Sequence, residues 1–167
     1  MKKLYIIRHA KSDWTDITLD DFHRSLSNRG IKNATFMGKL LNQKNIKPDL
    51  IISSPALRAY STAELIAKEI EYDKVITANQ FIYDASVDTL QEIITYISDD
   101  KDVVFLVGHN PSISSLAYLL GNLREDVPTC SIIEIDFHTD SWVNASRENS
   151  LLISYEYPKK HLKEKKS

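Results

Sequence analysis

The sequence is poor in cysteine, in glycine and in long apolar runs. Its single thiol, Cys130, has no partner within the chain for a disulfide. Four glycines and five prolines among 167 residues are too few for a disordered or fibrous chain. No apolar stretch approaches the ~20 residues of a membrane-spanning helix, and residues 1–9 are too short and too soon charged to act as a signal peptide. We therefore expect a globular, cytoplasmic protein with no membrane partner.

Charge of one sign is not in excess either. Lys and Arg total 21 against 23 for Asp and Glu, which gives a net charge of −2. This balance offers no general attraction to nucleic acid, so we expect no nucleic-acid partner and only local recognition of any anion. The length suits a single domain, which we place at 1–157. Residues 158–167 form a basic tail with little to bury, expected to be flexible, with a docking role as the alternative.

Hydrophobic patterning predicts an α/β fold. Continuous apolar runs, typical of strands buried on both faces, occupy 4–7, 50–52 and 103–107. Apolar residues at helical spacing predict helices over about 28–44, 55–70, 87–98 and 111–121. Alternating residues over 131–137 and 150–157 predict a pair of strands near one edge. The expected fold is a three-layer sandwich with a mostly parallel central sheet flanked by helices.

Capping residues sharpen the predicted helix boundaries. Ser27 is a candidate N-cap of the first helix. Ser54 and Pro55 are expected to open the second helix, because proline is tolerated in a first turn. Pro111 is expected to start the last of the four helices, and Gly121 to end it in the left-handed conformation.

Basic side chains follow each of the three apolar runs. Arg8 and His9 follow the first run, Arg58 lies in the first turn of the helix after the second, and His109 follows the third. Ligands of open α/β sheets bind beyond the carboxyl ends of the strands, so we expect these four residues to meet. Two guanidiniums and two imidazoles, with nearby helix N-termini, form a site suited to phosphate.

The residue types in this predicted site indicate phosphoryl transfer. An unprotonated imidazole is a good nucleophile, and attack of His9 on phosphorus would give a phosphoenzyme that water then hydrolyses. The arginines would stabilise the charge on the phosphoryl oxygens. Two arginines beside the histidines disfavour a divalent cation, so we expect no metal and no cofactor. Each residue alone also fits a structural role, and it is their combination that favours catalysis.

Four sequence blocks resemble those of a known family. The blocks are RHAKSDW at 8–14, RSLSNRG at 24–30, PDLIISSPALRAYSTAE at 48–64 and VGHNPS at 107–112. In order and spacing they resemble the histidine phosphatase superfamily, which has the phosphoglycerate mutase-like fold. RHAKS, SPALRAxxTAE and VGHNP look most like its short bacterial phosphohistidine phosphatase branch. The resemblance implies that His9 is the phosphorylated nucleophile and that Arg8, Arg58 and His109 complete the phosphate pocket.

The same resemblance suggests three further site residues. Ser12 matches the serine of the mutases' RHGxSxWN motif and is a candidate phosphate contact, although Thr15 replaces the asparagine of that motif. Arg24 precedes Ser25 where many members of the branch have proline, and it is a candidate substrate contact or a surface arginine. Asp84 is the candidate for the acid that protonates a leaving alcohol in the family's phosphomonoesterases, or simply a turn residue.

We expect no inserted lid segment between the predicted elements, whereas larger relatives carry such segments. An open pocket favours a protruding phosphate, so we expect a metal-independent phosphatase acting on phosphohistidine in a phosphorylated protein. The alternatives are a phosphomonoesterase for a small phosphate ester, such as a sugar or nucleotide phosphate, and a non-catalytic phosphate-binding protein.

Overall fold

A six-stranded sheet in the order β3-β2-β4-β1-β5-β6 organises the chain, and the computed structural model describes residues 1–162. The strands are β1 (Lys2–Arg8), β2 (Leu50–Ser53), β3 (Thr77–Ala78), β4 (Val103–Gly108), β5 (Ile132–Phe137) and β6 (Ser150–Glu156). Strands β3, β2, β4 and β1 pair in parallel, whereas β5 and β6 pair antiparallel. The predicted mostly parallel sheet, with two final strands at one edge, is confirmed.

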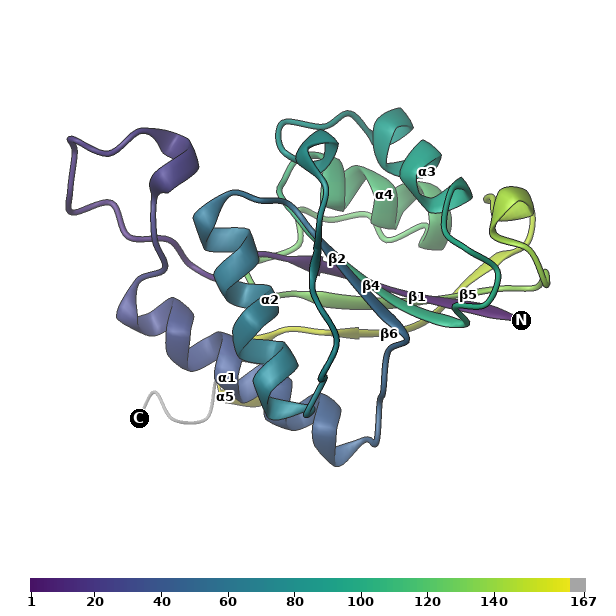
Figure 1. Cartoon of the computed structure of the whole chain (residues 1–167), viewed down its shortest axis with the longest axis horizontal. Helices are drawn as coiled ribbons and strands as arrows, with labels where there is room; N and C mark the ends of the chain where they lie inside the picture. The colour runs from purple at the N-terminus through teal and green to yellow at the C-terminus, as the bar shows by residue number, and fades with distance from the viewer. Residues whose placement is uncertain (163–167) are drawn as a thin grey trace.

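Helices cover both faces of the sheet (Figure 1). Helices α1 (Asn28–Gln43) and α2 (Leu57–Glu69) pack together on one face. Helices α3 (Val87–Thr95) and α4 (Ser112–Gly121) lie on the other face. The remaining helical segments are η1 (Asp21–His23), η2 (Gln80–Ile82), η3 (Trp142–Asn144) and α5 (Pro158–Leu162). This arrangement is the three-layer sandwich that the sequence predicts.

Strand β1 shows why its apolar run is continuous. Successive side chains of a strand point to opposite faces of the sheet. Leu4 and Ile6 belong to the core beneath α3 and α4, whereas Tyr5 and Ile7 belong to the core beneath α1 and α2. Because helices cover both faces of the sheet, both sets of side chains must be apolar. Polar side chains that could act on a ligand can therefore follow β1 only at its carboxyl end.

Two predicted helix starts are wrong by one or two residues. Helix α2 begins at Leu57 with Ala56 as its N-cap, not at Pro55. The reason is that the Ser54 amide still donates to Val107 of β4, so the chain leaves the sheet later than the proline suggests. Helix α4 begins at Ser112, with Pro111 in the N-cap position.

Three further boundaries differ from the prediction. Gly121 remains helical, and Asn122 takes the left-handed conformation at φ 55°, which asparagine tolerates better than most residues. Helix α3 ends at Thr95, short of residue 98. Strand β3 was not predicted because it is two residues long and both are exposed, so it leaves no apolar pattern.

The first part of the predicted basic tail forms helix α5. Pro158 is buried at the start of α5. His161 Nε2 lies 2.7 Å from Glu156 Oε1, and its ring packs 6.0 Å from that of Phe36 on α1. These contacts fix the first half of the tail against α1. The rest of the predicted tail, residues 163–167, lies outside the described residues.

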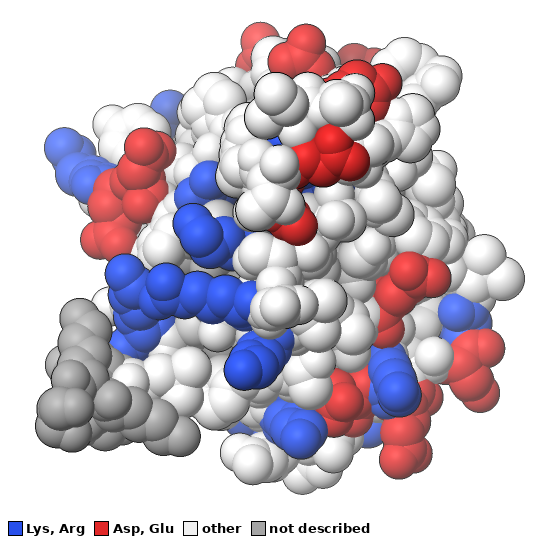
Figure 2. Space-filling model, turned by 90° about the vertical axis from the view of Figure 1, so that its left-hand side faces the viewer, with Lys and Arg blue, Asp and Glu red and all other residues white. Residues whose placement is uncertain are grey.

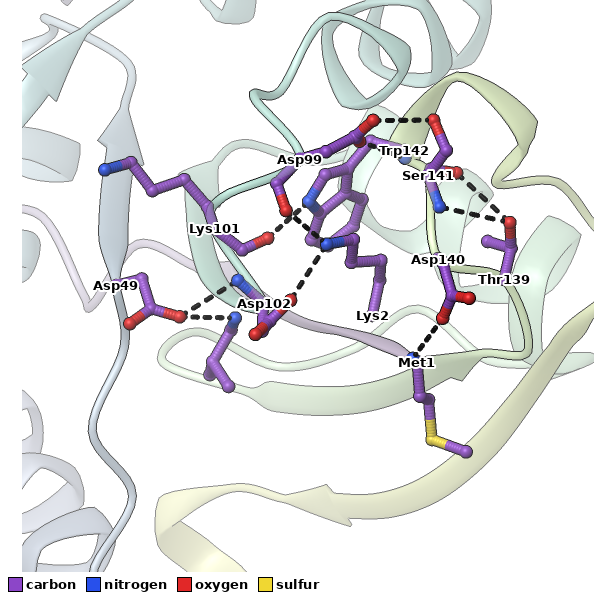
Figure 3. A network of polar contacts seen from close by, with 11 residues as sticks. Met1, Lys2, Asp49, Asp99, Lys101, Asp102, Thr139, Asp140, Ser141 and Trp142 are labelled. Carbon is purple, nitrogen blue, oxygen red and sulfur yellow. Dashed lines mark hydrogen bonds and ion pairs between the residues drawn. The ribbon is translucent and has the colours of Figure 1, made fainter.

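A polar network ties together the amino ends of three strands (Figure 3). The Lys2 ammonium, whose side chain is only 4% exposed, donates to the Asp99 carbonyl at 2.6 Å and to the Asp102 carboxylate at 2.8 Å. Asp49 Oδ2 accepts from the amides of Asp102 and Val103. A buried ammonium requires such partners. The network therefore fixes the starts of β1, β2 and β4, at the opposite end from their carboxyl ends.

In the described part of the chain, no helix is long and apolar enough to cross a membrane.

Candidate active site

The four predicted residues Arg8, His9, Arg58 and His109 meet at the carboxyl ends of β2, β4 and β1. These strands are neighbours in the sheet, so the residues that follow them share one edge. The imidazoles of His9 and His109 are 5.2 Å apart between ring centroids. Both guanidiniums are close enough to influence the pKa values of both histidines. Figure 2 looks onto this end of the molecule.

His9 is held as a neutral imidazole with one nitrogen free. Its amide donates to the Gly108 carbonyl at 3.0 Å, and its carbonyl accepts from Cys130 at 3.0 Å. Nδ1 lies 2.6 Å from the Ala10 carbonyl, and because a carbonyl only accepts, Nδ1 carries the proton. Burial lowers the pKa of His9 to about 4, and Arg58 and Arg8 act in the same direction. Nε2 therefore carries a lone pair at neutral pH, as a nucleophile requires.

His109 forms the second imidazole wall. Its Nε2 lies 2.8 Å from the Ser54 hydroxyl, which also accepts from the Ala56 amide. Burial is the main reason that the pKa of His109 is lowered to about 3, and His9 and Arg58 act in the same direction. The ring of Tyr83 packs edge-on against it at 5.6 Å. Ser54 thus orients the imidazole of His109 from the end of β2.

Buried nitrogens of three candidate site residues have no hydrogen-bond partner among the described residues. They are Arg8 Nε, Arg24 Nε and His109 Nδ1. Arg8 uses another nitrogen to donate to the Val127 carbonyl at 2.8 Å, so its side chain is nevertheless fixed in place. Buried polar groups normally find partners. Arginine donors that lack acceptors among residues 1–162 suit an anion with several oxygens, such as phosphate.

Asp21 is a site residue that the sequence analysis missed. Arg58 donates to the Asp21 carbonyl at 2.7 Å and to its Oδ2 at 2.9 Å. The Tyr83 hydroxyl donates to the same Oδ2 at 2.6 Å. This hydrogen bond and Arg58 keep the pKa of Asp21 below its ordinary value, so the carboxylate is ionised. Asp21 lies in η1, where no apolar pattern marks it, and only the fold brings it to Arg58.

Ser12 and Arg24 line the loop that leads away from His9. Ser12 is 8% exposed and forms an antiparallel bridge with Leu26. The Arg24 guanidinium lies 3.5 Å from the centroid of the Trp14 ring, a close cation–π contact. Arg24 is only 9% exposed, so it is covered by Trp14 and is not a free surface arginine. Direct phosphate contact by either residue stays a prediction.

Thr62 connects the two chain segments that carry the site. Its hydroxyl accepts from the Ala10 amide at 3.0 Å and donates to the Arg58 carbonyl at 2.7 Å. It is completely buried. The bonds tie the residue that follows His9 to the first turn of α2. Thr62 belongs to the STAE part of the third sequence block, which is the signal that could have indicated it.

Comparisons with known proteins identify the family of the chain. A sequence profile of the histidine phosphatase superfamily (branch 1) matches residues 4–82. An uncharacterized chloroplast protein of Arabidopsis thaliana is 30% identical over 155 residues, covering 86% of this chain and 70% of the plant protein. The chain belongs to the histidine phosphatase superfamily.

Two further comparisons concern characterised or solved members of the superfamily. The mitochondrial serine/threonine-protein phosphatase Pgam5 of Drosophila ananassae is 36% identical over 78 residues, which cover 47% of this chain but only 26% of Pgam5. A solved structure from Agrobacterium tumefaciens, assigned to the SixA phosphohistidine phosphatases, superposes with a TM-score of 0.78 at 26% identity. That match covers 94% of this chain and 98% of the other, so it spans the whole short fold.

Asp84 directly follows Tyr83, but no hydrogen bond joins its side chain to the described site residues. The residue is exposed and adopts a left-handed conformation at φ 58°. Its carboxylate makes no hydrogen bond to any described residue, whereas the preceding Tyr83 contacts both Asp21 and His109. A role for Asp84 as a superfamily acid stays a prediction.

Over residues 1–162, no three His, Cys, Asp or Glu side chains are grouped to hold a metal ion.

Proposed function

We propose that the protein is a metal-independent phosphatase that removes the phosphoryl group from phosphohistidine in proteins. His9 Nε2 attacks phosphorus, a P–N bond to His9 forms, and the P–N bond to the substrate imidazole breaks. The departing nitrogen takes up a proton. Water then attacks phospho-His9, which releases phosphate and regenerates the neutral imidazole. Arg8, Arg58 and His109 donate to the phosphoryl oxygens in both steps.

The ion pair between Asp21 and Arg58 is the observation that carries this proposal. The Asp21 carboxylate accepts directly from Arg58 of the predicted phosphate pocket, and this contact favours its ionised form, so it is a poor proton donor. An alkyl phosphate expels a basic alkoxide and gains roughly 10²–10⁴-fold from a positioned acid. Imidazole, with an unperturbed pKa of about 6.5, leaves without one. A site with an ionised carboxylate beside its arginine therefore suits P–N cleavage better than alkyl ester cleavage.

The comparisons support the same choice without deciding it. The SixA structure matches over nearly its full length, which favours a phosphohistidine substrate. Pgam5, whose name describes a serine/threonine phosphatase, is matched over about a quarter of its length, which keeps phosphoserine as the second candidate. The two candidates differ in the bond that is broken.

A substrate panel tests the proposal. Peptides of identical flanking sequence that carry phosphohistidine or phosphoserine should differ in kcat/KM by at least about 10²-fold in favour of phosphohistidine. His9→Ala should abolish turnover of both, whereas His138→Ala, which changes an exposed histidine outside the site, should retain it. Equal rates on the two peptides, or a preference for phosphoserine, would contradict the assigned substrate. Retention of more than a tenth of the activity by His9→Ala would contradict the assigned nucleophile.

A further inference from the structure

A hollow that we call the basic pocket is lined in part by residues close in sequence to His9. It encloses about 130 Å³ and is lined by Lys11, Arg29, Asn33, Pro128, Thr129, Pro158 and Lys159. Three of these residues are cationic and none is acidic. The volume is well below the roughly 300–1,000 Å³ of a metabolite site. The basic pocket therefore suits a small anionic group and not an enclosed metabolite.

The three cations of the basic pocket are left without partners by the described chain. Lys11, Arg29 and Lys159 are exposed, and no carboxylate within residues 1–162 forms an ion pair with them. Nearby lysines behave differently: Lys44 and Lys160 lie 3.1 and 3.5 Å from the Glu156 carboxylate. Within residues 1–162, no carboxylate therefore neutralises the basic pocket.

Helix α1 adds to the positive potential. Arg29 lies in its first turn, which contains no acidic residue. The N-terminus of a 16-residue helix carries a partial positive charge that a carboxylate would ordinarily compensate. Figure 2 shows several Lys and Arg side chains gathered on this end of the molecule, although the chain as a whole carries a net charge of −2. The charge at this end of the molecule is therefore opposite in sign to the net charge of the chain.

The basic pocket shares two walls with the catalytic residues. Lys11 follows His9 by two residues, so their Cα atoms are at most about 7 Å apart. Pro128 and Thr129 lie between Val127, which accepts from Arg8, and Cys130, which donates to the His9 carbonyl. A residue a few positions from a phosphohistidine seated at His9 can therefore reach the basic pocket.

The contact between the start of α1 and Lys11 fixes this geometry. The Ser27 amide donates to the Lys11 carbonyl at 2.9 Å. A Cβ at Gly30 would come within 2.1 Å of that carbonyl oxygen, so only glycine permits the close approach. The backbone of Lys11 and the start of α1, which carries Arg29, are held together as one rigid wall.

We propose that the basic pocket docks an Asp or Glu side chain that flanks the phosphohistidine of a protein substrate. The inference rests on the proposed function and adds a substrate preference to it. Each exposed charge pair contributes modestly, so the three cations together are expected to change affinity on the order of tenfold. Because the basic pocket lies outside the reacting groups, the effect should fall on KM and not on kcat.

Two phosphohistidine peptides test the docking site. They are identical except that Glu or Gln occupies the three positions on either side of the phosphohistidine. The wild-type protein should show a KM about tenfold lower for the Glu peptide. The triple variant Lys11→Gln, Arg29→Gln, Lys159→Gln should lose this preference, with kcat for para-nitrophenyl phosphate unchanged within about twofold. The matched control Lys68→Gln, Lys74→Gln, Arg147→Gln, which removes three exposed cations elsewhere, should keep it.

The readouts separate this inference from the proposed function. Equal KM values for the two peptides in the wild type, or the same preference in the triple variant, would overturn the docking site. Hydrolysis of neither peptide would instead overturn the proposed function. In that event fluorescence anisotropy with the unphosphorylated Glu peptide decides: binding by the wild type but not by the triple variant supports the docking site, and absence of binding by the wild type overturns it.

Discussion

The Asp21 carboxylate lies 2.9 Å from the Arg58 guanidinium, on the very donors that phosphate is expected to use. The Tyr83 hydroxyl donates to the same carboxylate oxygen at 2.6 Å. Phe22 of η1 packs edge-on against Tyr83 at 5.2 Å, so η1 and the loop after η2 meet above Arg58. Asp21 therefore has two opposing effects: it orients Arg58, and it competes with a phosphate dianion for the same fork of donors.

We expect Asp21→Asn to strengthen inhibition by the product phosphate. The amide keeps an acceptor for Tyr83 but removes the negative charge that faces the anion. A partly exposed ion pair contributes modestly, so the inhibition constant should fall about two- to fivefold. Inhibition of para-nitrophenyl phosphate hydrolysis by inorganic phosphate measures the effect. Asp20→Asn, which changes an exposed neighbour bonded to His23, is the control. An unchanged constant for Asp21→Asn would show that Asp21 does not compete with phosphate.

The low pKa of His9 leads to a second prediction. Its unfolded-state pKa is about 6.5, and burial lowers the folded-state pKa to about 4. His9 should therefore stay neutral down to about pH 5 and become protonated as the pH falls through about 4. NMR titration of the imidazole, assigned with His9→Asn, measures this directly. Added phosphate should raise the midpoint, because an anion favours the charged imidazole. A midpoint near 6.5 in the free protein would contradict the buried, neutral nucleophile.

The sequence revealed the four central residues because each follows an apolar run, and runs of this kind mark buried parallel strands. The position of Arg58 relative to β2 was predicted correctly even though the start of α2 was not, since an error of two residues leaves it in the first turn. Asp21 could not be found in the same way. It reaches Arg58 across 37 residues of sequence through a short 3-10 turn, and such contacts depend on the folded path of a loop.

Thr62 illustrates a positioning role that we expect to be measurable. Thr62→Val keeps the shape of the side chain but leaves the buried Ala10 amide without an acceptor, at a cost of about 1–3 kcal/mol in the free energy of unfolding. The segment that carries His9 would also lose its link to Arg58, so kcat should fall on the order of tenfold. Denaturant unfolding and aryl phosphate turnover measure the two effects. Thr62→Ser keeps the hydroxyl and should restore both, whereas an unaltered kcat in Thr62→Val would limit Thr62 to stability.

Activity should be unaffected by EDTA. In the proposed mechanism Arg8 and Arg58 supply the charge stabilisation that a metal ion gives in other phosphatases. Turnover of para-nitrophenyl phosphate before and after chelation and gel filtration is the measurement, with a metal-dependent phosphatase treated in parallel as the control. Loss of activity that added Mg²⁺ or Zn²⁺ restores would contradict the metal-free mechanism.

Asp84 provides the last test, because the need for an acid depends on the leaving group. Its exposed carboxylate forms no bond to the described site, yet Tyr83 beside it contacts His109, so a bound ester could bring a leaving oxygen toward Asp84. If Asp84 is an acid, Asp84→Asn should slow alkyl phosphate hydrolysis by roughly 10²-fold or more and change phosphohistidine hydrolysis by less than about twofold. Comparison of kcat/KM for the two substrates measures this difference, with Asp88→Asn as an exposed control in the first turn of α3. Equal effects on both substrates, or none on either, would make Asp84 a turn residue. The site would then depend on a leaving group that departs without an enzymic acid, which is the property of the imidazole in phosphohistidine.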